Sequence, residues 1–225
     1  MSRLVVVIAG TVAGTLLSHS LAAAPRATVP QVSVRTYNKL GVAPGELATA
    51  LATARAILGG AAIDLEWREC GPCDDPPGPR ELIVRIVAAT PQAEPESLGY
   101  SLVDVRQRSG SLATIFASRI ESMAALARVD PGVLLGRTIA HELAHLLIGT
   151  TEHSTRGLMR ARWTTRELER DRPRDWVLSR AEGARMRRGL VARVRGPRVP
   201  EIVVAADGEL RQGPLQPDTA GSRVP

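Results

Sequence analysis

His141-Glu142-Leu143-Ala144-His145 is the segment that decides how this sequence folds and what it binds. On an α-helix, two histidines four positions apart differ by about 40° around the helix axis, so both imidazoles can reach one zinc ion. The glutamate between them then points toward water at that metal. With 4 His in 225 residues, a chance match to this pattern is expected in roughly 0.4% of shuffled sequences. The segment therefore predicts a helix that binds Zn2+.

The flanking residues predict one buried helix around this segment. Asp130 suits an N-cap, and Pro131 suits the first helical position, where its missing N–H costs nothing. Apolar residues recur all round the helix between positions 133 and 148, which is typical of a buried active-site helix. Gly149 follows, where a left-handed C-terminal residue is expected. The alternative, a buried helix with two satisfied core histidines, leaves the His/Glu/His spacing unexplained.

A third histidine, His153, lies just beyond Gly149. A chain that folds back at this glycine can offer His153 as a third ligand. Glu152 is the alternative third ligand, and we favour its neighbour. The only other histidine, His19, lies in an expected export signal.

The run from His141 to His153 resembles the zincin zinc metallopeptidases, and more narrowly the matrixin-like metzincins. Their pattern is H-E-x-x-H-x-x-G-x-x-H followed by a methionine-containing turn. This chain reads H-E-x-x-H-x-x-x-G-x-x-x-H, and Gly157-Leu158-Met159 is similar to the methionine turn under the metal. The resemblance implies His141, His145 and His153 as zinc ligands and Glu142 as the catalytic general base.

The resemblance also implies a fold and an activity. The expected fold is α+β and zincin-like, with a small mixed sheet, an active-site helix and C-terminal helices. Residues 113–117 would form the edge strand that pairs with an extended peptide, the alternative being an ordinary sheet edge. The implied activity is that of a metalloendopeptidase, in which Glu142 takes a proton from zinc-activated water and passes it to the leaving amine. The sequence identifies no oxyanion partner; Arg160 is close enough in sequence to be considered, but an exposed arginine near a turn usually has no such role.

Two other functions remain as alternatives. One is a catalytically inactive, exported zinc-binding protein of zincin-like fold. Structural zinc sites are normally closed by a fourth protein ligand, often cysteine. The two cysteines, at positions 70 and 73, are far from His141 in sequence, which argues mildly against this alternative. The other is a redox protein built on the two cysteines.

Cys70-Gly71-Pro72-Cys73 has three interpretations. A thioredoxin-type redox pair should open a helix, but the following residues 74–79 cannot start a long one. A cysteine peptide that occupies the zinc in some metzincin propeptides precedes the catalytic domain, whereas this one lies inside it. We favour a disulfide in an oxidising compartment. Because the ring between such close cysteines is strained, a reduced pair is the remaining alternative.

The N-terminal residues predict export. Residues 1–24 combine Arg3, an apolar stretch and a small-residue cleavage zone, as in a signal peptide, and we favour cleavage after Ala22. An uncleaved anchor is the alternative, but the apolar stretch of 14 residues, 4–17, is short for a bilayer. With this signal peptide, the protein is expected to be secreted or periplasmic. Residues 25–195 are expected to form one zincin-like catalytic domain, and residues 196–225 a weakly ordered tail.

Charge and composition restrict the partners. The net charge is +6, and residues 156–195 hold 13 Arg against 5 acidic residues. Besides Trp163 and Trp176 this segment has no aromatic residue, and it has no recognisable nucleic-acid-binding motif, so we interpret it as a solvated basic helical face. We expect a peptide or protein substrate, no nucleic-acid partner, no stable membrane insertion and a monomer.

Periodicity and capping signals predict the remaining elements. Thr164-x-x-Glu167 and Ser179-x-x-Glu182 have capping-box spacing, which predicts two short helices divided by Pro173. The other expected elements are a strand at 29–37, a helix at 44–58, a strand at 63–67, a fully buried strand at 81–88, a hairpin of 99–105 with 111–116, and a helix at 120–129.

Overall fold

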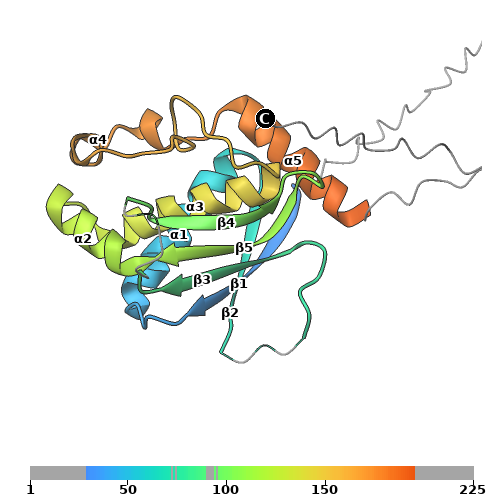
Figure 1. Cartoon of the computed structure of the whole chain (residues 1–225), viewed down its shortest axis with the longest axis horizontal. Coiled ribbons are helices and arrows are strands. Elements are labelled where there is room, and N and C mark those ends of the chain that lie inside the picture. The colour runs from blue at the N-terminus through green and yellow to red at the C-terminus, as the bar shows by residue number, and fades with distance from the viewer. Residues whose placement is uncertain (1–28, 72, 74, 90–93, 95, 196–225) are drawn as a thin grey trace, which may run out of the picture.

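The computed structural model describes residues 29–71, 73, 75–89, 94 and 96–195 (Figure 1). The expected export signal and the expected tail both lie outside these residues. In the described part of the chain, no helix has the length and apolar character that crossing a membrane requires.

A single five-stranded mixed sheet organises the described chain, in the order β2-β1-β3-β5-β4. Four of its strands run parallel, and β4 pairs antiparallel with β5. The predicted strands and hairpin are therefore confirmed, as is the α+β class. The strands are β1 (Gln31–Asn38), β2 (Asp64–Glu69), β3 (Glu81–Val87), β4 (Gly99–Asp104) and β5 (Ser109–Phe116).

The edge strand differs from the prediction. β5, which contains residues 113–116, pairs with β3 on one side and β4 on the other, so it is an inner strand. The edge strands are β4 and β2, and the assignment of residues 113–117 to the edge was wrong. The physical reason is burial: four consecutive residues of β5, from Ala113 to Phe116, are buried, as expected for a strand flanked on both sides, whereas β4 alternates between half-buried and exposed positions.

Two helices cover one face of this sheet. α1 (Pro44–Gly60) and α3 (Pro131–Ile148) pack against each other, and α3 also packs against β4 and β5 (Figure 1). β3 is buried on the helix-facing side, where Leu82 is fully inaccessible, while Arg85 on the other side is exposed. The prediction that β3 is fully buried was wrong, because a strand in a sheet with helices on one face buries only alternate residues.

The helix α3 matches its sequence signals. The side chain of Asp130 accepts a hydrogen bond of 2.9 Å from the amide of Val133, which caps the first turn. Gly149 ends the helix with a φ of 70°, and its amide bonds to the carbonyl oxygen of His145. Since this φ lies in the left-handed region, a side chain here would be strained. The predicted buried helix with its two caps is confirmed.

Of the C-terminal helices, α5 packs against α3 and α4 packs against α2, and both predicted capping boxes form. Thr164 and Glu167 cap α4 reciprocally, and the same exchange joins Ser179 and Glu182 at the start of α5. The prediction of two short helices holds for α4 but not for α5, which has 16 residues. The C-terminal elements are α4 (Thr165–Arg170), the 3-10 helix η1 (Pro173–Trp176) and α5 (Arg180–Arg195), whereas α2 (Ala117–Ala127) precedes α3.

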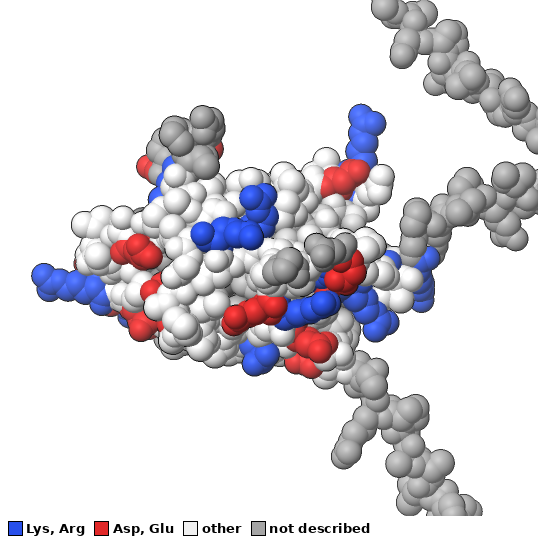
Figure 2. Space-filling view, turned by 90° about the horizontal axis from the view of Figure 1, so that it is seen from below, with Lys and Arg blue, Asp and Glu red and all other residues white. Residues whose placement is uncertain are grey.

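Some arginines of residues 156–195 form ion pairs within the chain, and others are exposed to solvent. Arg160 pairs with Glu167 at 2.5 Å, whereas Arg188 and Arg195 on α5 are exposed. On the face shown in Figure 2, basic and acidic side chains are interspersed rather than gathered into one broad basic patch.

Candidate metal centre

The structure brings together the three histidines that the sequence singled out. His141 and His145 project from successive turns of α3, and His153 reaches them from the loop that follows Gly149. The Nε2 atom of His145 lies 3.0 Å from that of His141 and 3.3 Å from that of His153. Ring nitrogens of all three lie within 4.8 Å of one another. Three nitrogen donors from two different segments therefore converge on one point.

Backbone carbonyl groups determine which nitrogen of each α3 histidine faces this point. The Nδ1 atom of His141 is 2.9 Å from the carbonyl oxygen of Leu158, and that of His145 is 2.8 Å from the carbonyl oxygen of Thr150. A carbonyl oxygen can only accept, so each Nδ1 carries the proton. In the neutral rings the Nε2 atoms then present bare lone pairs to one another.

This donor set fits a zinc ion. The bare Nε2 atoms of His141 and His145 face each other at 3.0 Å and cannot hydrogen-bond to each other, so a cation between them would stabilise the arrangement. With zinc–nitrogen bonds of about 2.0 to 2.1 Å, tetrahedral ligands are separated by about 3.3 to 3.4 Å, close to the 3.0 and 3.3 Å between the Nε2 atoms. Three nitrogen ligands leave a fourth position, which is typical of catalytic rather than structural zinc.

Burial keeps the two α3 histidines neutral. His141 and His145 are 7% and 5% exposed. Burial lowers the pKa of His141 to about 3, assisted by the charge that His145 would carry. Burial likewise lowers the pKa of His145 to about 4, and it lowers the pKa of the more exposed His153. All three rings are therefore available as neutral donors at neutral pH.

Glu142 is buried between α3 and the edge strand β4. Its carboxylate accepts a hydrogen bond of 2.7 Å from the hydroxyl of Ser101 on β4. The strand passes very close, since a Cβ on Gly99 would lie 3.3 Å from the Cγ of Glu142. Burial raises the pKa of Glu142 to about 7, and the hydrogen bond from Ser101 opposes that rise. A carboxyl group with such a pKa can accept and release a proton near neutral pH.

The segment that resembles a methionine turn supports His141. Met159 is buried, and the carbonyl oxygen of the preceding Leu158 bonds to His141. The indole nitrogen of Trp163 donates to the same oxygen at 3.3 Å, and its ring meets His141 edge-on at 5.6 Å. Gly157 turns the chain with a φ of 74° against the carbonyl oxygen of Val177. Sequence reasoning missed Ser101 and Trp163 as neighbours of the site.

Two other residues considered from sequence do not join the cluster. The described cluster contains His153 and not Glu152, which is exposed. Arg160 pairs with Glu167, and its guanidinium lies 5.6 Å from the Trp176 ring, so it stabilises the C-terminal segment. This arrangement gives no support to Arg160 as an oxyanion partner.

The two cysteines form a disulfide away from the histidines. Cys70 and Cys73 are bonded to each other, which confirms the predicted pairing. The described residues that follow, 75–80, form turns and coil rather than a helix. A thioredoxin-type active site needs its motif at the start of a helix, so the redox alternative loses its structural basis.

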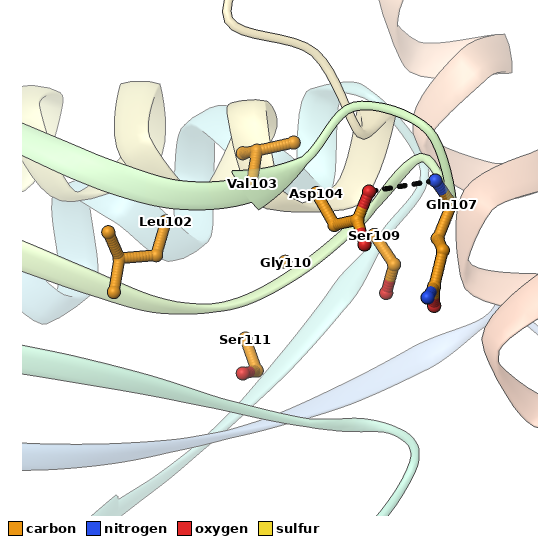
Figure 3. A pocket seen from close by; sticks show the side chains of 7 residues that line it. All are labelled: Leu102, Val103, Asp104, Gln107, Ser109, Gly110 and Ser111. Atoms are coloured by element: carbon orange, nitrogen blue, oxygen red, sulfur yellow. Dashed lines mark hydrogen bonds between the residues drawn. The ribbon is translucent and has the colours of Figure 1, made fainter. Parts of the chain in front are cut away.

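A shallow pocket lies elsewhere, at the far end of the β4–β5 hairpin. It is lined by residues 102–104, 107 and 109–111 (Figure 3). The carboxylate of Asp104 accepts from the backbone amide of Gln107 at 3.0 Å, so it stabilises the turn. The pocket contains none of the histidines and belongs to the hairpin rather than to the candidate metal centre.

Comparison with known proteins shows that this chain is similar to two solved structures described below. No protein-family model matches the chain, and no curated protein matches it. The archaemetzincin from Methanopyrus kandleri is similar with a TM-score of 0.47 and 15% identity, covering 75% of this chain and 99% of its own. A zinc-dependent peptidase from Methanocorpusculum labreanum gives 0.45 and 14%, covering 70% and 99%.

Proposed function

We propose that this chain is an exported zinc metallopeptidase that hydrolyses peptide bonds, with a matrixin-like metzincin domain at residues 25–195. His141, His145 and His153 bind the metal, and Glu142 is the general base. The observation that carries the proposal is the convergence of the three histidine ring nitrogens, with the buried Glu142 next to His141 on the same helix. A structural zinc site accounts for the histidines, but it does not require a buried glutamate whose carboxylate is held by a serine of the edge strand.

The chain's own residues suit the proton transfers of peptide hydrolysis. When bound, zinc would activate water and polarise the substrate carbonyl group. Glu142 takes a proton from the attacking water and donates it to the leaving amine. Ser101 orients the carboxylate for both transfers through its 2.7 Å hydrogen bond. Carbonyl oxygens of Leu158 and Thr150 hold the histidine rings in the metal-binding tautomer.

The edge strand offers a binding mode for an extended peptide. A peptide can add to a sheet edge through main-chain hydrogen bonds. Since β4 is an edge strand and its Ser101 contacts Glu142, a peptide paired with β4 would lie near the general base. This replaces residues 113–117 with β4 as the proposed substrate-binding strand.

The test is the variant Glu142→Gln in the mature protein. Glutamine has nearly the same shape, and it keeps an acceptor for Ser101 but cannot take a proton. We expect one bound zinc per chain, an unchanged fold and at least a 10²-fold loss of activity on a broad peptide mixture. Full activity in this variant would show that the base is wrongly assigned. Zinc binding without peptidase activity in the wild-type protein would support the alternative of an inactive zinc-binding protein.

A further inference from the structure

The loop that carries His153 is anchored to the start of α5. The hydroxyl of Ser154, the residue after His153, donates to Oε1 of Glu182 at 2.5 Å. The amide of Ser154 donates to the carbonyl oxygen of Met159 at 2.7 Å, which closes the loop on itself. The amide of Leu158 in turn donates to the carbonyl oxygen of Val177 at 3.0 Å. The segment 177–182 therefore holds both ends of this loop.

The Glu182 side chain that makes this contact is almost completely buried, with 3% of its surface exposed. A buried carboxylate is costly unless hydrogen bonds stabilise its charge. Burial raises the pKa of Glu182, but hydrogen bonds from Ser154 and Ser179 outweigh it and hold the pKa below its ordinary value. The charge is thus retained, and a charge-assisted hydrogen bond is stronger and more directional than a neutral one.

We infer that Glu182 is a positioning residue for His153, acting through the hydroxyl of Ser154. His141 and His145 are fixed by their places on a rigid, buried helix. His153 lies on an exposed loop, where it would otherwise lose rotational and backbone freedom only on binding the metal. The contact with Glu182 anchors that loop in advance, so the third nitrogen is already oriented. This inference rests on the proposed zinc site and adds the residue that prepares it.

A simpler role for Glu182 is to cap its own helix. Its Oε2 atom accepts from the amide of Ser179 at 2.6 Å, and the hydroxyl of Ser179 accepts from the amide of Glu182 at 3.2 Å. The two roles use different serines. Ser154→Ala removes the contact with the ligand loop and leaves the cap, whereas Ser179→Ala removes the hydroxyl of the cap and leaves the ligand-loop contact.

The experiment measures zinc affinity of the mature protein by competition with a chromophoric chelator. We expect Ser154→Ala to weaken zinc binding by about 10-fold, the lower end for loss of an outer-shell partner. Ser154→Thr, which keeps the hydroxyl, should restore most of the affinity. Ser179→Ala should lower the thermal midpoint of the metal-free protein through loss of the cap but leave zinc affinity unchanged. The absorption spectrum of the cobalt-substituted protein should change in Ser154→Ala and not in Ser179→Ala.

The outcomes distinguish the inference from the proposed function. Wild-type zinc affinity in Ser154→Ala, or equal weakening in Ser154→Ala and Ser179→Ala, would overturn the positioning role while leaving the zinc site intact. Failure of the wild-type protein to bind zinc would overturn the proposed function and the inference together. In Glu182→Gln, a loss of affinity that Ser154→Ala does not increase further would support the inference, because the two groups would act as one unit.

Discussion

The hydroxyl of Ser101 lies 2.7 Å from Oε2 of Glu142 and 2.8 Å from the carbonyl oxygen of the same residue. One side chain of the edge strand therefore contacts both the carboxylate and the backbone of the proposed general base. Because β4 is also the strand to which we propose that a peptide adds, this contact would join substrate binding and proton transfer in a single element.

Replacing Ser101 should impair proton transfer rather than binding. Ser101→Ala removes the hydrogen bond that orients Glu142, and we expect kcat to fall about 10-fold with little change in KM or zinc content. Ser101→Thr should retain most of the activity. The control is Ser111→Ala, an exposed serine of β5 in the same hairpin, which should behave as wild type in steady-state kinetics. Equal losses in the two alanine variants would contradict the orienting role.

Removing the two histidines of α3 should abolish metal binding. In His141→Ala/His145→Ala, one of the three converging nitrogens remains, which is too few to hold zinc with useful affinity. Metal analysis should find one zinc per wild-type chain and none in the double variant. Full zinc occupancy in that variant would place the metal elsewhere.

The third ligand can be tested by comparing adjacent residues. His153→Ala should weaken zinc affinity and lower activity, because the third nitrogen is lost and the open position is no longer correctly shaped. Glu152→Ala is the matched control, since Glu152 is exposed and outside the cluster. Chelator competition should show a large effect only for the histidine. The reverse pattern would assign the third ligand to Glu152.

The metal-free protein should lose stability as the pH falls below about 6.5. Burial lowers the pKa values of His141 and His145, so between their folded values and the ordinary one the unfolded chain binds more protons. Stability then decreases with decreasing pH, by at most about 1.4 kcal/mol per pH unit for each histidine. Urea unfolding of the wild type and His141→Gln/His145→Gln should show this decrease as a difference between the two proteins. Glu142, with its raised pKa, acts in the opposite direction but is present in both.

The disulfide should stabilise the loop after β2 without contributing to catalysis. Labelling of unreduced protein should find no free thiol at Cys70 or Cys73. Cys70→Ser/Cys73→Ser should lower the free energy of unfolding by about 2 kcal/mol, the value that the chain-entropy relation gives for so short a loop. Peptidase activity should be retained. Loss of activity with unchanged stability would revive a redox role for the pair.

The sequence by itself determined the local features of this protein. Each of these features depends on groups within a few residues of one another, so its spacing can be read from the sequence. They are the i, i+4 histidines, the caps of α3, the two capping boxes and the disulfide. His153 was also predictable, because the glycine that turns the chain back lies four residues before it. The expected strands were confirmed for the same reason, since alternation of apolar residues is a local pattern.

Only the tertiary structure decided which distant groups complete the site. The hairpin signals show that β4 and β5 pair, but not which of them meets β3, because that choice depends on the burial of a whole strand against helices elsewhere in the chain. Ser101 contacts Glu142 across 41 residues, His141 bonds to a carbonyl 17 residues away, and Ser154 meets Glu182 across 28. At such separations, no spacing pattern in the sequence distinguishes these serine, leucine and glutamate residues from the others of their type. Their roles arise because packing of β4 and α5 against α3 removes these polar groups from water and obliges them to bond to one another.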